Sequence, residues 1–281
     1  MDTIVRTIAD KLPSLIDRNV VVEYRAGGTG LVASAFMKST PPDGSHLMFS
    51  GLSVMAFFPF LYSSLPYDPE ADLTPVCDAA TTANALVVSN GTGVSNVNEY
   101  VEAVRRDPKL GSVGTSGLAS VGAFMIVLLR KISGADIRLV AYRGGQPLLT
   151  DLIGNHVAAG QSVLSDYVEP HRAGQVKIIG VMSEKRTKLA PDIPTFKEQG
   201  FADLHGQTSM GFFARGGTPR DVVSRYAAAI TKVVSMPDVR ARLESIGIEA
   251  TGGTPEEFAG AVKYQRERWE PVAREAGIKL N

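Results

Sequence analysis

The stretch Gly111–Arg130 reads GSVGTSGLASVGAFMIVLLR, a polar turn that runs directly into an apolar helix. Ser120 is the best N-cap candidate, because a serine hydroxyl accepts a hydrogen bond from the free N–H groups of a first turn. The helix after it is nearly all apolar and must be buried. Such a helix start can hold a carboxylate or phosphate with backbone N–H groups alone. An ordinary capped core helix would give the same pattern.

Strand-like runs alternate with helical patterns along most of the chain. The expected strands are rich in apolar and β-branched residues, and they lie at residues 19–24, 46–50, 83–89, 112–117, 137–142, 157–163, 177–182 and 208–214. Helical periodicity fills the intervals and the whole chain after Pro219. This alternation predicts an α/β fold with mostly parallel sheets flanked by helices.

A chain of 281 residues exceeds the usual size of one hydrophobic core, so we expect two lobes. Crossings near residues 90 and 208 would give a first lobe of 1–89 plus 209–281 and a second of 90–208. Acidic and basic residues number 29 each, so no net field attracts nucleic acid, and we expect none as a partner. The single cysteine, Cys77, excludes an internal disulfide.

Catalysis and metal binding are only weakly indicated. Ser116, Asp166 and His205 follow the chain order of an α/β-hydrolase triad. The nucleophile elbow needs Gly-x-Ser-x-Gly, however, and in GTSGL at 114–118 the second glycine comes one place early. Histidines and carboxylates do not cluster at metal-ligand spacing, so we expect neither a metal nor a cofactor. Glycine and serine turns at strand ends suit reversible capture of a small anion better than chemistry.

Short motifs, weak singly but specific in this order and spacing, cover nearly the whole chain. They include VVVEYRAGGTG at 20–30, LPYDP at 65–69, YRGG at 142–145, LTDLIG at 149–154, PDIPT at 191–195 and GTPEEF at 253–258. With these motifs the chain resembles the Bug family, also called TctC. Its members are periplasmic solute-binding receptors of tripartite tricarboxylate transport systems.

The resemblance implies a two-lobed periplasmic binding protein fold whose lobes are joined by crossing strands. The lobes would close on a small organic carboxylate in the cleft between them and deliver it to membrane transporter subunits, without catalysis. We expect a periplasmic monomer. The alternatives are a soluble enzyme that acts on an anionic substrate and a sensory receptor that presents its ligand to a signalling partner.

The resemblance also implies where the ligand binds. Family members hold the carboxylate with backbone amides and hydroxyls from loops at strand ends. Carried over by position, the expected ligand-binding residues are Ser50, Gly51, Ser53, Ser116, Gly117, Ser120, Gly144, Gly145 and Ser162. Each could also be a plain turn or cap residue.

The chain departs from the family pattern at several positions. It starts just after the strand and glycine-rich loop with which family members begin, and we expect the upstream gene to encode both with an export signal. Ser209 stands where a family tryptophan is expected, and Ser162 stands where many members have an acid that pairs with an ammonium group. Glu23 and Asp151 are the nearest acids in the motif regions. We therefore expect a dicarboxylate or an aromatic acid as ligand rather than an amino acid.

Overall fold

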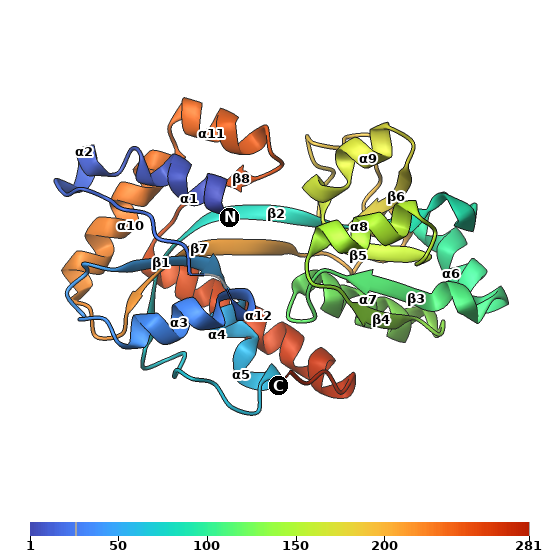
Figure 1. The fold of residues 1–281 in the computed structure, drawn as a ribbon, viewed down its shortest axis with the longest axis horizontal. Helices are drawn as coiled ribbons and strands as arrows, with labels where there is room; N and C mark the ends of the chain where they lie inside the picture. Colours follow the sequence, from blue (N-terminus) through green and yellow to red (C-terminus); the bar gives the residue numbers. More distant parts are fainter. Residues whose placement is uncertain (26, 281) are drawn as a thin grey trace. The chain divides into compact units, whose positions relative to one another are not determined.

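The computed structural model of the chain describes residues 1–25 and 27–280. Two compact units make up the chain (Figure 1). Unit 1 comprises Met1–Thr81, Ser209–Pro271 and the described end of the chain from Lys279, and unit 2 comprises Thr82–Thr208 and Val272–Ile278. These units differ from the expected lobes because unit 2 takes the second part of the long strand β2 (Leu73–Ser89) and a short C-terminal segment.

Unit 1 combines a small sheet with a set of helices. Its strands are β1 (Leu47–Gly51), the first part of β2, most of β7 (Gln207–Arg215), and β8 (Glu249–Ala250). Its helices are α1 (Asp2–Ala9), α2 (Pro13–Ile16), α3 (Leu31–Lys38), α4 (Ser53–Ala56), α5 (Phe58–Leu61), α10 (Arg220–Val234), α11 (Pro237–Glu244) and most of α12 (Pro255–Glu275). Apolar side chains of α1, α10 and α11 pack with those of β2 and β7 into one buried core.

Unit 2 has its own sheet and its own flanking helices. Besides the second part of β2, its strands are β3 (Ser112–Thr115), β4 (Arg138–Ala141), β5 (Ala159–Val163) and β6 (Val176–Val181). Its helices are α6 (Val97–Arg106), α7 (Val121–Ser133), α8 (Gly145–Ile153) and α9 (Val168–Arg172). Helix α7 contacts β4 and β5, and α8 contacts β3 and β5. Short 3-10 turns lie at Asn90–Thr92, Pro108–Gly111, Leu164–Asp166 and Lys197–Gln199.

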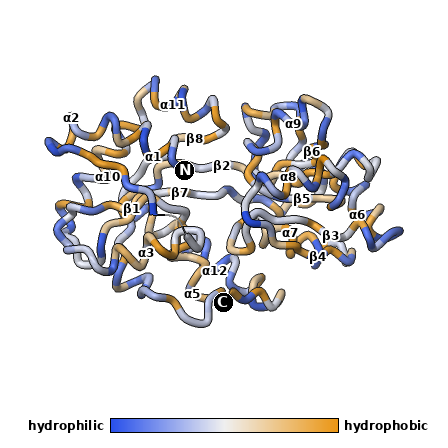
Figure 2. Tube along the Cα trace, viewed as in Figure 1, coloured by the Kyte–Doolittle hydropathy of each residue, from blue (hydrophilic) through white to orange (hydrophobic). Residues whose placement is uncertain are grey.

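Helix α7 is buried along most of its length, as its sequence predicts. Every residue from Val121 to Val127 is buried, and so is Leu129. Figure 2 shows hydrophobic colours along α7 and on the neighbouring strand β4. Burial of so many apolar side chains fixes the helix in unit 2, and its polar first turn is held in place as a result.

The α/β class is confirmed, but the strand directions are mixed rather than mostly parallel. β3 pairs parallel with β4 and β5, whereas β5, β6 and β8 pair antiparallel with β2, and β1 pairs antiparallel with β7. Parallel pairing follows from a helix that joins two strands of one sheet, as α7 joins β3 to β4. β2 and β7 differ from the strands within one unit, because the chain passes from one unit to the other inside each of them.

The strand expected at residues 19–24 is absent from the structure. Val21 is 89% exposed and Tyr24 is 77% exposed, while Val20 packs partly against the core of unit 1. β-Branched residues favour a strand only where a neighbouring strand offers pairing and packing, and no described strand pairs with this segment. Glu23 forms an ion pair with Arg25 instead, with Oε1 and Nη2 2.7 Å apart.

Candidate functional site

The polar turn before α7 is built around Ser120, which caps the helix as predicted. Its Oγ accepts a hydrogen bond from the backbone N–H of Ala123 at 3.1 Å and donates one to the carbonyl of Gly117 at 2.8 Å. No described residue accepts a hydrogen bond from the N–H of Val121 or Gly122. Two donors at the positive end of the helix dipole thus have no partner among the described residues, and both belong to buried residues.

Gln161 holds this turn from the neighbouring strand β5. Its side chain is 1% exposed, and its Nε2 donates to Thr115 Oγ1, which in turn donates to the carbonyl of Gly117 at 3.0 Å. The other amide atom, Oε1, is buried without a hydrogen-bond partner among the described residues. A Cβ on Gly122 would lie 1.8 Å from this oxygen. A buried acceptor without a partner costs free energy, so this oxygen is an unsatisfied polar group beside the first turn of α7.

Ser116 and Ser162 meet across this turn together with an acid. Ser162 Oγ lies 2.8 Å from Ser116 Oγ and 2.9 Å from Asp166 Oδ2. Gly145, the first residue of α8, packs against the same acid: a Cβ there would lie 2.3 Å from Oδ2. Gly144 precedes it with φ of +102°, a conformation that favours glycine. Burial raises the pKa of Asp166, and the hydrogen bond with Ser162 acts in the opposite direction.

Unit 1 holds the other predicted residues, Ser50, Gly51 and Ser53, where β1 ends and α4 begins. Ser50 is buried, and a Cβ on Gly30 would lie 2.7 Å from its Oγ, so the glycine loop packs directly on it. A Cβ on Gly51 would lie 3.4 Å from Ser53 Oγ and 3.9 Å from the carbonyl of Ser209. The loop itself includes Ala26, which lies outside the described residues.

Ser209, where the resemblance implies a tryptophan, contacts Asp78, a half-buried acid of β2. Its Oγ donates to Asp78 Oδ2 at 3.3 Å, and Asp78 Oδ1 is buried without a partner among the described residues. Burial raises the pKa of Asp78 to about 7. This acid has no place in the sequence-based expectations, because nothing in the local pattern of β2 distinguishes a buried carboxyl from an exposed one.

The predicted residues therefore fall into two groups that belong to different units. Unit 2 brings Ser116, Gly117, Ser120, Gly144, Gly145 and Ser162 to the start of α7 and α8; unit 1 holds Ser50, Gly51 and Ser53. Sequence reasoning missed Thr115, Gln161 and, above all, Asp166 as a partner of Ser162. Gln161 gave one signal, because it is a long polar side chain in a strand of small residues, but no such signal marks Asp166.

Asp166, considered from the sequence as a member of a hydrolase triad, has its side-chain hydrogen bond with Ser162. Among the described residues no histidine forms a hydrogen bond or ion pair with it. Glu23 and Asp151, the acids considered from the sequence, bond elsewhere: Glu23 with Arg25, and Asp151 with the hydroxyl of Tyr142 at 2.8 Å.

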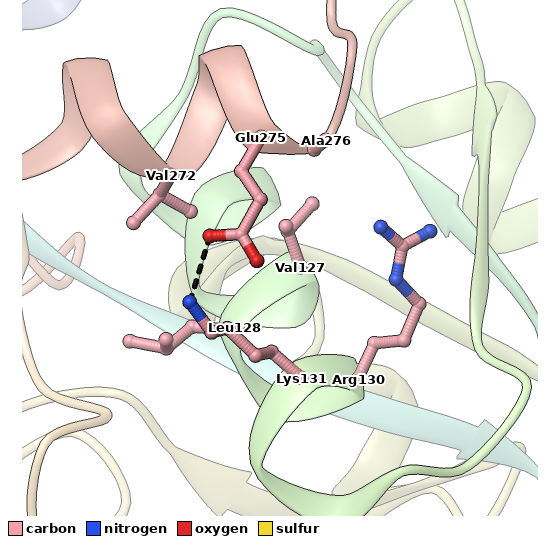
Figure 3. A pocket seen from close by; sticks show the side chains of 7 residues that line it. All are labelled: Val127, Leu128, Arg130, Lys131, Val272, Glu275 and Ala276. Carbon is pink, nitrogen blue, oxygen red and sulfur yellow. Dashed lines mark hydrogen bonds and ion pairs between the residues drawn. The ribbon is translucent and has the colours of Figure 1, made fainter.

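A small pocket of unit 2 lies at the other end of α7 (Figure 3). Val127 and Leu128 of α7 face Val272 there, and Lys131 Nζ and Glu275 Oε2 form an ion pair of 2.7 Å at its rim. None of the predicted ligand-binding residues lines this pocket. Within residues 1–25 and 27–280, the helices are too short or too polar to cross a membrane.

Comparison with known proteins identifies the family to which the chain belongs. Residues 4–278 match the model of the TctC family, described as the tripartite tricarboxylate transporter family receptor. A UPF0065 protein encoded in the tcbD–tcbE intergenic region of Pseudomonas sp. (strain P51) is 33% identical over 288 residues, covering 100% of this chain and 84% of that protein.

Solved structures share the fold over almost the full chain. Rpa4515 of R. palustris with adipate is 28% identical with a TM-score of 0.88, covering 99% of this chain and 93% of that one. MatC (Rpa3494) from Rhodopseudomonas palustris with bound malate is 26% identical with a TM-score of 0.82, covering 96% and 93%. Periplasmic binding proteins are among the structures with this fold. The chain belongs to the TctC family of tripartite tricarboxylate transporter receptors, which are solute-binding proteins and not enzymes.

Proposed function

We propose that this chain is a monomeric periplasmic receptor that binds a small organic carboxylate and delivers it to a tripartite tricarboxylate transporter. The start of α7 in unit 2 carries the proposal. There the N–H groups of Val121 and Gly122 lie at the positive end of a buried helix, and Ser116 stands in the turn before it with a hydroxyl that only Ser162 contacts among the described side chains. Such donors suit a carboxylate, which is acceptor-only when ionised.

The ligand class that we favour is a dicarboxylate or an aromatic acid rather than an amino acid. Ser162 gives no charge to pair with an ammonium group. Asp166, its hydrogen-bond partner, is an acid, but burial raises its pKa and favours the neutral form, which tolerates a second carboxyl group nearby. The adipate bound by Rpa4515 and the malate bound by MatC support this class, since neither has an amino group.

A thermal-unfolding screen tests the ligand class directly. The panel contains succinate, adipate, malate, benzoate and phthalate, with aspartate and glutamate as amino-acid probes. A ligand at 100 times its dissociation constant adds about 2.7 kcal/mol of stability. We expect plain carboxylates to give the largest upward shifts. Tighter calorimetric binding of either amino acid than of every plain carboxylate would contradict the proposed class.

Ser116→Glu tests the position of the site. A carboxylate at this turn would repel an anionic ligand, so we expect the variant to fold normally and to lose most of its affinity. Ser14→Glu is the matched control, because it adds the same charge at an exposed serine of α2 in unit 1. Full affinity in Ser116→Glu would exclude this turn as the site. Ser50, Gly51 and Ser53 of unit 1 stay proposed contacts, to be tested by equivalent substitutions.

A further inference from the structure

Ser162 stands in the middle of a hydrogen-bonded chain that leads from Ser116 to Asp166. Its Oγ is within hydrogen-bond distance of both, at 2.8 Å from Ser116 Oγ and 2.9 Å from Asp166 Oδ2. A hydroxyl carries a single proton, so Ser162 can donate to only one of the two neighbours and must accept from the other. The chain therefore has two possible directions, and the protonation state of Asp166 selects between them.

With Asp166 ionised, the carboxylate can only accept. Ser162 then donates to Oδ2, and Ser116 donates to Ser162. Ser116 Oγ is left with lone pairs alone, which suits a ligand that donates, such as an ammonium or a hydroxyl group. A ligand carboxylate would meet these lone pairs with no proton between them, and the charge of Asp166 would repel it.

With Asp166 protonated, every donor in the chain reverses. The carboxyl O–H donates to Ser162, Ser162 donates to Ser116, and the proton of Ser116 is free to point toward a ligand. Ser116 is half-buried, and no other side-chain hydrogen bond competes for its hydroxyl among the described residues. With the chain in this direction, the turn offers a carboxylate one more donor, in addition to the N–H groups of the first turn of α7.

We propose that Asp166, acting through Ser162, is a positioning residue that decides whether Ser116 accepts or donates, so that a carboxylate binds together with a proton on Asp166. This inference rests on the proposed function, because it assigns a regulation to the same site. Affinity for a plain carboxylate then falls as pH rises, and a neutral substitute for Asp166 removes that dependence.

The groups around Asp166 favour this assignment. No described lysine, arginine or histidine forms an ion pair with it, so the hydrogen bond with Ser162 alone favours the charged form and burial opposes it. The phenol of Tyr167, the next residue in the chain, is buried, and the charge of Asp166 contributes to the raised pKa of that phenol. Helices α8 and α9 contact the same turn, and their ionisable side chains bond elsewhere: Asp151 with Tyr142, Glu169 with Arg172, and His171 with Ile178.

Calorimetric titration with adipate and with malate between pH 6 and pH 8.5 tests the inference. Ordinary carboxyl pKa values are about 4, and the second carboxyl of a dicarboxylic acid ionises at a somewhat higher pH. Both probes are therefore fully ionised in the upper part of this range, where only the protein titrates. Above the pKa of Asp166 in the unliganded protein, we expect affinity to fall by about tenfold per pH unit. Titrations in buffers of different ionisation enthalpy should show uptake of about one proton for each ligand bound.

Asp166→Asn is the decisive variant. Its side-chain N–H₂ donates to Ser162 as a protonated acid would, so we expect adipate affinity at pH 8.5 to equal or exceed that of the wild type, with less than about twofold change across the range. Asp151→Asn is the matched control, an acid-to-amide change in the same unit that leaves the chain of hydroxyls intact. It should keep the full dependence on pH.

The possible failures can be told apart. A wild-type protein that binds adipate or malate without proton uptake would overturn the inference and leave the proposed function standing. An Asp166→Asn protein that keeps the wild-type pH dependence would do the same. Wild-type protein that binds no carboxylate at any pH would overturn both. The proton count needs no variant, so the inference stays testable even if Asp166→Asn does not fold.

Discussion

Gln161 Oε1 lies only 1.8 Å from the position that a Cβ on Gly122 would occupy. Gln161 comes from β5 and Gly122 from the first turn of α7, so a glycine is what allows the strand amide to approach the helix so closely. The same amide holds Thr115 at the start of the polar turn. Gly122 is thus part of the construction of the candidate site, although it carries no side chain.

Replacing Gly122 should separate steric demand from helix propensity. Alanine is normally better than glycine inside a helix by about 1 kcal/mol. Here the added Cβ would overlap a buried side chain, so we expect Gly122→Ala to lower the free energy of unfolding by about 1–3 kcal/mol in urea titrations. Gly260→Ala in α12 is the control, because a Cβ there meets nothing within 4 Å. If Gly122→Ala and Gly260→Ala raise the free energy of unfolding equally, the Gln161 side chain can move away from the added Cβ without a loss of stability.

The cap of α7 could be predicted because capping is local. A serine before an apolar run offers its hydroxyl to an N–H three residues on, and the structure has this bond between Ser120 and Ala123. Strand pairing is not local. Residues 19–24 have the composition of a strand but no pairing partner in the structure, whereas β2 begins at Leu73, well before the expected residue 83.

The chemistry of the candidate site was only partly accessible from the sequence for the same reason. Ser116 and Ser162 were expected at the site from the family resemblance, but their contact at 2.8 Å was not. Asp166 was known only as one member of an unconvincing triad. Its role depends on a 3-10 turn that brings it back toward Ser162, and on the absence of a side chain at Gly145, neither of which a local pattern reveals.

Ser120→Ala should affect both stability and ligand binding. Loss of an N-cap side chain costs about 1 kcal/mol of stability, and here the carbonyl of Gly117 also loses the hydrogen bond from Ser120 and keeps the one from Thr115. Asn96→Ala is the matched control, since Asn96 caps α6 of the same unit by accepting from Glu99 N–H at 2.8 Å. We expect similar losses in thermal unfolding from both variants and weaker carboxylate binding from Ser120→Ala alone. If Ser120→Ala and Asn96→Ala bind the carboxylate equally well, Ser120 caps the helix but does not contribute to ligand binding.

Gly145→Ala should disturb the acid of the site more than the fold. A Cβ at this position would lie 2.3 Å from Asp166 Oδ2 and 3.4 Å from Ser162 Oγ, so the carboxyl group must move away. Losing the Ser162–Asp166 hydrogen bond costs about 1 kcal/mol, and we expect a severalfold change in carboxylate affinity by calorimetry. The control Gln146→Ala removes the exposed side chain next to it and should change nothing. Unchanged affinity in Gly145→Ala would mean that Asp166 does not act on the ligand.

The half-buried acid of unit 1, Asp78, should make stability depend on pH. Burial raises its pKa in the folded protein to about 7, well above the ordinary value of 3.8. Between these values the folded state holds a proton that the unfolded state has lost, so the free energy of unfolding decreases as pH rises from about 4 to about 7. Asp166 contributes in the same direction, because its pKa is also raised.

Asp78→Asn isolates the contribution of this group. Asparagine resembles the protonated acid in shape and carries no charge, and it can still accept the hydrogen bond from Ser209. One pKa unit is worth about 1.4 kcal/mol, so the variant should gain up to about 4 kcal/mol over the wild type at pH 8, and almost nothing at pH 4. Urea unfolding at a series of pH values gives both curves. If the free energies of unfolding of the two proteins stay parallel from pH 4 to pH 8, the folded protein does not release a proton from Asp78 in that range. The pKa of Asp78 is then not raised to about 7.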